Sequence, residues 1–206
     1  MALELSGAIQ AALSEAQSAL SAFAAEAENV GRIARMAEGL TACFRAGGKV
    51  LACGNGGSAC DALHFSEEFT GRFRDDRPAL PVIPLLEAGH LTCVANDYGF
   101  EHVFARGVEA YGKPGDVLVA LSTSGNSPNV VRAVETARAR GLKVYLFLGK
   151  AGGKLRGQGD EEIWVRSQNT ERVQEVHMAV LHILIECVER GMFPENYGPA
   201  GAKKRS

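Results

Sequence analysis

Residues 49–58 read KVLACGNGGS, and residues 116–128 read DVLVALSTSGNSP. Each stretch is a short apolar run followed at once by glycines and hydroxyl residues. An apolar run of this length is typical of a strand buried on both faces, and glycine-rich turns commonly join such a strand to a helix. The two stretches therefore predict strand–turn–helix units of a parallel α/β sheet.

The same alternation continues along the chain. The five predicted strands are residues 49–53, 80–86, 116–122, 143–148 and 161–165. The helices predicted between and after them are residues 57–74, 100–111, 128–140 and 170–190. Strands and helices that alternate at this spacing predict an α/β fold with an open five-stranded parallel sheet flanked by helices.

The segment before the first strand has a different pattern. Residues 5–27 are rich in alanine, and a second helical run spans residues 30–44 before Gly47-Gly48 ends it. The larger apolar side chains of the first run fall near one stripe: Ile9, Leu13, Leu20 and Phe23. We expect residues 1–47 to form helices for oligomer packing, residues 48–193 to form the sheet domain, and residues 194–206 to form a disordered tail.

Composition excludes several classes of protein. The 206 residues carry a net charge of -2, which lacks the basic excess of a sequence-independent nucleic-acid binder. The five cysteines are scattered without a C-x-x-C pair, as expected of reduced thiols. No stretch approaches 18 consecutive apolar residues, and no basic segment precedes an apolar core at the N-terminus. We therefore expect a cytoplasmic protein that contacts no membrane.

Both glycine-rich turns have anion-binding chemistry. In the first loop, residues 54–58, the glycines can bring backbone amides close to a ligand at a helix start. The second loop, residues 122–127, has four hydroxyls in six residues, with Ser127 at the N-cap position and Pro128 at the first helical position. Plain tight turns would explain each loop alone. Together the loops favour a phosphate monoester, which needs many donors and no cationic cluster.

A dinucleotide-binding loop is the alternative interpretation of the first turn. Gly54, Gly56 and Ala59 match G-x-G-x-x-A after a strand. That motif requires an acidic residue about 20 positions later, whereas the nearest candidate, Glu87, lies about thirty positions away. The second hydroxyl-rich loop has no role in such a site, so the phosphate interpretation is favoured.

Polar residues on two helices are candidates for the chemistry. His64 and Glu68 are four apart and share a helix face, where they can hold a metal, act as an acid–base pair, or form a solvated surface pair. The last helix offers Gln174, His177 and His182. His182 stands inside the apolar run AVLHILI, where it is either a hydrogen-bonded core histidine or a site residue.

Helix geometry limits how these residues combine. Gln174 and His182 are eight apart, about 12 Å along a straight helix. We therefore predict a site at a subunit junction, or two sites that take one of these residues each. Asn96 and Asp97 either bind sugar hydroxyls or cap a helix that begins near Phe100.

In these residues and the stretches around them, the chain resembles the sugar isomerase (SIS) domain family and, within it, the phosphoheptose isomerases. The matching stretches are CGNGGSACDALHFSEEFTGRF, CVANDYGFEHVF, GDVLVALSTSGNSPNVV, GKAGGKL and ERVQEVHMAVLHILIE. The resemblance implies an SIS fold, a homotetramer with active sites at subunit junctions, and a sugar phosphate substrate. It implies conversion of sedoheptulose 7-phosphate to D-glycero-D-manno-heptose 7-phosphate through an enediol, for bacterial heptose and lipopolysaccharide biosynthesis.

The family's residue roles transfer to matching positions. The implied ligands of one Zn²⁺ per subunit are His64, Glu68, Gln174 and His182. Glu68 and His182 would form the acid–base pair. The implied substrate-binding residues are Gly56, Gly57, Ser58, Glu68, Asn96, Asp97, Ser122, Thr123, Ser124, Ser127 and Gln174. Nitrogen and oxygen ligands suit zinc or another borderline divalent ion.

Two departures from the family pattern concern the rim of the expected site. Glu87-Ala88-Gly89 replaces a hydroxyl- and Asp-containing turn, and Glu171 stands where a short acidic residue or alanine is usual. Some relatives are instead non-catalytic SIS scaffolds that bind a replication initiator protein, and these lack the full acid–base set. The presence of Glu68, Gln174 and His182 favours the isomerase over that alternative.

Overall fold

The five apolar runs are the strands of one parallel sheet in a computed structural model, which describes residues 5–198. The strands are β1 (Val50–Cys53), β2 (Val82–Pro84), β3 (Val117–Ser122), β4 (Lys143–Gly149) and β5 (Glu161–Val165). Their order in the sheet is β2-β1-β3-β4-β5, and every neighbouring pair runs parallel. The predicted open five-stranded parallel sheet is confirmed.

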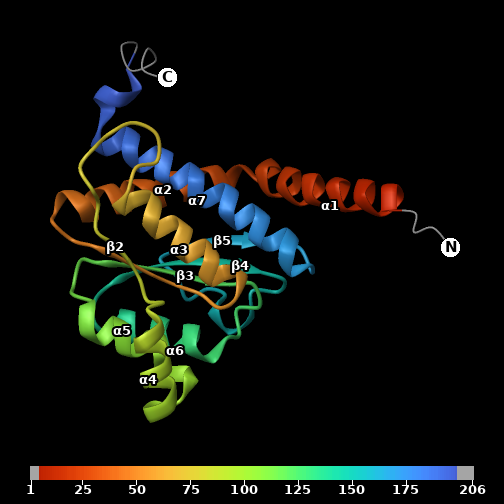
Figure 1. The fold of residues 1–206 in the computed structure, drawn as a ribbon. Coiled ribbons are helices and arrows are strands. Elements are labelled where there is room, and N and C mark those ends of the chain that lie inside the picture. Colours follow the sequence, from red (N-terminus) through yellow and green to blue (C-terminus); the bar gives the residue numbers. More distant parts are fainter. Residues whose placement is uncertain (1–4, 199–206) are drawn as a thin grey trace.

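Helices cover both faces of this sheet (Figure 1). The α-helices are α1 (Leu5–Ala25), α2 (Ala27–Arg45), α3 (Gly57–Thr70), α4 (Ala88–Tyr98), α5 (Val103–Tyr111), α6 (Pro128–Ala139) and α7 (Thr170–Met192). The 3₁₀ helices are η1 (Phe100–His102), η2 (Gly153–Leu155) and η3 (Pro194–Tyr197). Helices α2, α3 and α7 pack on one face, and α4, α5 and α6 on the other.

Burial on both faces explains why the central strand β1 is a continuous apolar run. In β1, Val50 and Ala52 join the core beneath α2, α3 and α7. Leu51 and Cys53, which point the other way, join the core beneath α4, α5 and α6. All four side chains are fully buried, so no position of this strand tolerates a polar side chain at low cost.

The sequence pattern does not predict helix α4. This helix fills the segment 88–98, whose apolar residues are few and mixed with small polar ones, and only Val94 of this helix is buried. Its start is marked by Glu87, whose carboxylate accepts hydrogen bonds from the backbone N–H groups of Gly89 and His90. The helix predicted over 57–74 ends earlier, at Thr70, because Gly71 follows.

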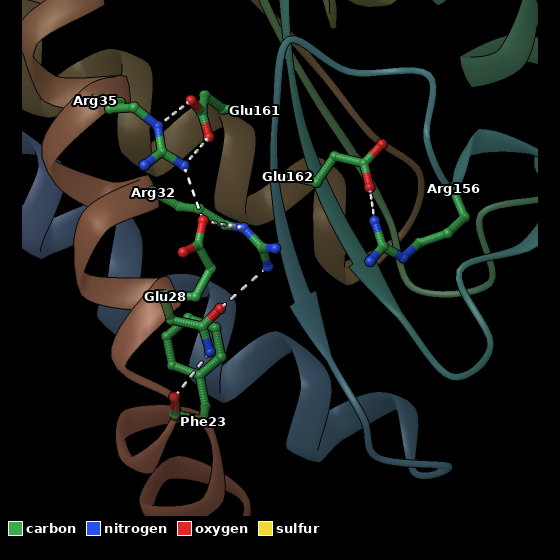
Figure 2. Close-up of polar contacts among 8 residues, drawn as sticks. Phe23, Glu28, Arg32, Arg35, Arg156, Glu161 and Glu162 are labelled. Carbon is green, nitrogen blue, oxygen red and sulfur yellow. Dashed lines mark hydrogen bonds and ion pairs between the residues drawn. The ribbon is translucent and has the colours of Figure 1, made fainter.

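The N-terminal helices differ in what they cover. Helix α2 packs on the sheet, whereas α1 projects beyond the body of the chain, and Phe23 is its only buried residue (Figure 1). Figure 2 shows that Arg35 of α2 pairs with Glu161 of β5, which ties α2 to the sheet. At the junction of α1 and α2, the Asn29 amide donates 2.8 Å to the Phe23 carbonyl oxygen. The stripe predicted on α1 is therefore largely exposed in the single chain: Leu13 is 61% exposed and Ile9 57%.

The C-terminal segment is in part folded onto the body. Residues 194–197 form η3, and the Tyr197 hydroxyl donates 2.7 Å to Glu189 of α7. The start of the segment predicted as a tail thus belongs to the fold, while residues 199–206 lie outside the described residues.

Between residues 5 and 198, no helix has the length and apolarity to cross a bilayer. All five cysteines lie in this part of the chain as free thiols.

Candidate active site

The first loop connects β1 to α3 and places Ser58 in the first turn of that helix. Ser58 is buried, while Gly56 and Gly57 are exposed. The side-chain amide of Gln174, from α7, reaches this turn, with its Nε2 3.5 Å from the Ser58 hydroxyl. A β-carbon on Gly57 would lie 2.6 Å from the same Nε2, so a larger residue here would require the Gln174 amide to move.

The second loop connects β3 to α6, and its hydroxyls are linked to one another. The Ser122 hydroxyl is 3.2 Å from that of Ser127 and accepts a hydrogen bond from the Gly125 N–H. Ser124 and Thr123 are half-buried. Ser127 occupies the N-cap position of α6, as predicted, but its side chain makes no capping hydrogen bond there. Its hydroxyl is therefore engaged within the loop and not with the helix.

A pair of asparagines ties the two loops together. Asn55 of the first loop and Asn129, in the first turn of α6, exchange two amide hydrogen bonds of 2.8 Å each. Asn129 is buried. Each amide satisfies a donor and an acceptor of the other, so the pair fixes the spacing between the loops. Sequence reasoning missed this link because the two residues lie 74 positions apart.

Three of the four proposed metal ligands lie together between α3 and α7. His64 Nε2 is 2.9 Å from His182 Nε2 and 3.4 Å from a Glu68 carboxylate oxygen. One nitrogen or oxygen atom from each residue lies within 4.8 Å of the others. Two ligands of a tetrahedral zinc, each about 2.0–2.1 Å from the ion, are separated by about 3.3 Å. The donor set and its spacing therefore fit a zinc ion.

Gln174 meets α3 at a different point from His182. It contacts Ser58, whereas His182 contacts His64, and these two α3 residues are six positions apart, about 9 Å along the helix. Within one chain, Gln174 thus lies at the first loop and His182 at the histidine–carboxylate cluster. A site at a subunit junction, or two sites that take one of these residues each, stays a prediction.

Burial changes the acid–base properties of the cluster. It raises the pKa of the Glu68 carboxyl, an effect that the nearby Glu67 reinforces and His64 opposes. Burial lowers the pKa of the His182 imidazole, and His64 lowers it further. A carboxyl and an imidazole with pKa values shifted toward each other can exchange roles as acid and base near neutral pH.

Two residues that support this cluster were not identified from the sequence. The Phe73 ring stacks on the His182 ring, at 5.8 Å between centroids and 23° between planes. Arg77 donates to the backbone carbonyls of Glu68 and Phe69 and forms a buried ion pair with Glu189. Both Phe73 and Arg77 lie in the loop after α3, where no periodicity marks a side chain as inward-facing.

His177, the third polar candidate on α7, is a core residue. Its ring is fully buried, packs edge-on against Phe147, and bonds through Nε2 to the Leu148 carbonyl oxygen at 3.0 Å. Burial lowers its pKa to about 4, against the opposing effect of the Leu148 hydrogen bond. His177 therefore belongs to the hydrophobic core.

Asn96 and Asp97 lie near the C-terminal end of α4. Both are exposed within α4, and the Asn96 amide donates 2.8 Å to the Asp97 carboxylate. The helical segments that follow have Gly99 and His102 at their N-cap positions, so the capping alternative is wrong. A sugar contact by these exposed groups stays a prediction.

The two departures from the family pattern have local explanations. Glu87 caps α4, and the two backbone hydrogen bonds it accepts lower the pKa of its carboxyl. Glu171 is exposed in the first turn of α7, where a carboxylate interacts favourably with the helix dipole.

Known proteins are similar to this chain in sequence and in fold. A model of the SIS domain family matches residues 13–149. The chain is 57% identical over 175 residues to a phosphoheptose isomerase of Fusobacterium nucleatum, covering 85% of this chain and 90% of the relative.

Two solved structures agree with these sequence matches. A phosphoheptose isomerase from Francisella tularensis matches with a TM-score of 0.87 and 34% identity, covering 91% of this chain and 100% of that one. The phosphoheptose isomerase of Neisseria gonorrhoeae matches with a TM-score of 0.84 and 38% identity, covering 90% and 98%.

Proposed function

The chain belongs to the SIS domain family and, within it, to the phosphoheptose isomerases, and we propose that it converts sedoheptulose 7-phosphate to D-glycero-D-manno-heptose 7-phosphate. The observation that carries this proposal is the cluster of His64, Glu68 and His182. His64 and Glu68 lie on α3, the helix that begins at the first anion-binding loop, and His182 reaches them from α7. A phosphosugar isomerase needs such a combination: donors for the phosphate and an acid–base pair for the carbonyl end.

Isomerisation moves one proton between carbons and one between oxygens. The proton leaves C1 of the ketose and returns to C2 through a cis-enediol, while the C1 hydroxyl loses a proton and the C2 carbonyl oxygen gains one. We assign the carbon proton to Glu68, because burial raises its pKa toward that of a useful base. We assign the oxygen protons to His182, because burial and the nearby His64 favour its neutral form, which can both donate and accept.

The loops are assigned to the other end of the substrate. Ser58 and the hydroxyls of the second loop, Ser122, Thr123, Ser124 and Ser127, would bind the phosphate. Backbone amides and hydroxyls at helix starts stabilise an anion without a basic cluster, in line with the net charge of -2. Asn96 and Asp97 would face the sugar, and Gln174 would contact the substrate or the metal.

We propose one Zn²⁺ per subunit, held by His64, Glu68, Gln174 and His182. The fit of three of these donors to a single ion supports this assignment. When bound, zinc would polarise the substrate carbonyl. Metal analysis of the purified protein should find close to one zinc per chain, and His64→Gln should lose it.

We propose a homotetramer in the cytoplasm, with residues 1–47 in the subunit contacts and residues 48–193 as the SIS domain. The exposed Leu5, Ile9, Leu13 and Leu20 on the projecting helix α1 support a partner surface there. The separate positions of Gln174 and His182 support sites completed across subunits. Light scattering coupled to gel filtration tests this assembly, and a monomer would refute it.

The activity is tested with purified protein and sedoheptulose 7-phosphate, followed by NMR. The aldoheptose phosphate should appear, and Glu68→Gln and His182→Ala should each abolish turnover while the oligomer stays intact. Glu109→Gln is a matched control, because Glu109 is exposed and, within residues 5–198, its carboxylate pairs with Arg106 on its own helix. An inactive wild-type enzyme, with or without added zinc, would refute the proposal.

A further inference from the structure

The segment between β4 and β5 packs against the second anion-binding loop. We call residues 149–155, GKAGGKL, the buttress segment. The Leu155 N–H donates 3.1 Å to the Gly125 carbonyl oxygen, and the Lys154 N–H donates 3.0 Å to the Asn126 side-chain oxygen. The Asn126 amide in turn donates 3.1 Å to the Ser124 carbonyl oxygen. The buttress segment therefore holds the loop through its backbone.

The two backbones approach so closely that side chains are excluded between them. A β-carbon on Gly153 would lie 2.6 Å from the Gly125 carbonyl carbon and 2.7 Å from Asn126 Cγ. A β-carbon on Gly125 would overlap the Gly152 carbonyl oxygen. Real β-carbon contacts below 3.0 Å are essentially absent from proteins, so either substitution must displace the loop.

The contact between the buttress segment and the second loop determines which polar groups of the loop are free to bind an anion. The Gly125 and Ser124 carbonyls accept the hydrogen bonds just described, and the Ser122 carbonyl accepts one from the Gly125 N–H. A β-carbon on Gly149 would lie 2.8 Å from the Thr123 carbonyl oxygen, so the buttress segment packs on that group as well. Carbonyl oxygens repel a phosphate, whereas hydroxyls and N–H groups attract it.

We infer that the buttress segment is a positioning element for phosphate binding: it packs against the carbonyl oxygens of Thr123, Ser124 and Gly125, so that the loop presents donors to the anion. The inference rests on the proposed function of the loop. According to this inference, Gly153 and Asn126 contribute to the affinity for the phosphate group and take no part in the proton transfers.

The test compares two glycines that share a left-handed backbone. Gly153 (φ +57°) contacts the loop, whereas a β-carbon on Gly157 (φ +80°) would have open space around it. Gly157→Ala therefore introduces the strain of a left-handed backbone without a clash against the loop. Binding of inorganic phosphate is measured by calorimetry, which needs no turnover. KM and kcat for sedoheptulose 7-phosphate are measured on the same samples.

We expect Gly153→Ala to weaken phosphate binding and to raise KM, both by tenfold or more, with kcat reduced less than threefold. Gly157→Ala should stay within twofold of wild type. If Gly153→Ala does not fold, Asn126→Ala, whose side chain is exposed, should still weaken phosphate binding three- to tenfold.

Three results would overturn the inference: equal effects of the two glycine variants, a loss confined to kcat, or a wild-type protein that does not bind phosphate. A wild-type protein that binds phosphate but does not turn over the ketose refutes the isomerase proposal instead. In that case a selective loss of phosphate binding in Gly153→Ala would still support the inference.

Discussion

Replacing His177 by glutamine removes a buried titratable ring, and we expect the variant to resist mild acid better than the wild-type chain. The Leu148 carbonyl oxygen can only accept a hydrogen bond, so His177 Nε2 carries the proton of the neutral ring. Nδ1 is buried and has no hydrogen-bond partner among the described residues. An added proton would therefore create an imidazolium with no acceptor at Nδ1, which is why burial lowers the pKa of His177 to about 4.

The size of the effect follows from the difference between the folded and unfolded pKa values. The unfolded ring takes up its proton below pH 6.5, while the folded ring stays neutral down to about pH 4. The free energy of unfolding therefore decreases as the pH falls through this window and levels off below it. Each pKa unit corresponds to about 1.4 kcal/mol, which gives a total near 3 kcal/mol and about 2 kcal/mol between pH 8 and pH 5.

Urea denaturation at pH 8 and pH 5, at one protomer concentration, measures this loss. The wild-type chain should lose about 2 kcal/mol more between these pH values than His177→Gln, whose amide can still donate to the Leu148 carbonyl. His90→Gln is the control, because His90 also bonds through Nε2 to a backbone carbonyl, that of Val103, but is only half-buried. Parallel pH profiles for wild type and His177→Gln would refute the reasoning.

Three further changes test other parts of the structure. Glu189→Gln leaves the buried Arg77 charge without its carboxylate and should lower the free energy of unfolding by about 3 kcal/mol; a loss below about 1 kcal/mol by urea denaturation would contradict a buried ion pair. Asn129→Ala leaves the Asn55 amide without its partner and should cost about 1–3 kcal/mol while weakening inorganic phosphate binding in calorimetry; unchanged phosphate affinity would show that the pair does not set the loop spacing. Removal of the proposed zinc by a chelator should lower the midpoint of thermal unfolding, and added zinc should restore it, since an ion that binds only the folded state stabilises that state. A midpoint that is unchanged by both treatments would argue against a bound metal.

The sheet was predictable because the central strands β1 and β3 are buried on both faces and are therefore almost entirely apolar, and the other three strands repeat the pattern in part. The prediction of β5 matches residue for residue, and the other four strands differ only at their ends. Helix α4 was not predictable in the same way. It buries only Val94, so it lacks the apolar stripe that distinguishes a helix from a loop, and its clearest local signal is the acidic N-cap, Glu87.

The candidate site was predictable only where its residues share one element. His64 and Glu68 lie on successive turns of α3, so their spacing alone places them together. The approach of His182 depends on how α7 packs against α3, which no local pattern encodes. For the same reason the sequence could not separate His177 from His182: both interrupt apolar runs, and only the packing shows that His177 faces the sheet and His182 faces α3.

Glycines illustrate the same limit at the two loops. A β-carbon at Gly57 would require the Gln174 amide to move, and a β-carbon at Gly125 would overlap the Gly152 backbone. From the sequence, both positions resemble ordinary turn glycines, for which a positive φ or a tight turn is sufficient explanation. Gly157 is such a case, with a positive φ and open space around it. The distinction matters for function, because a turn glycine shapes only its own loop. A contact glycine couples an anion-binding loop to a segment elsewhere in the chain, and through that segment to the rest of the fold.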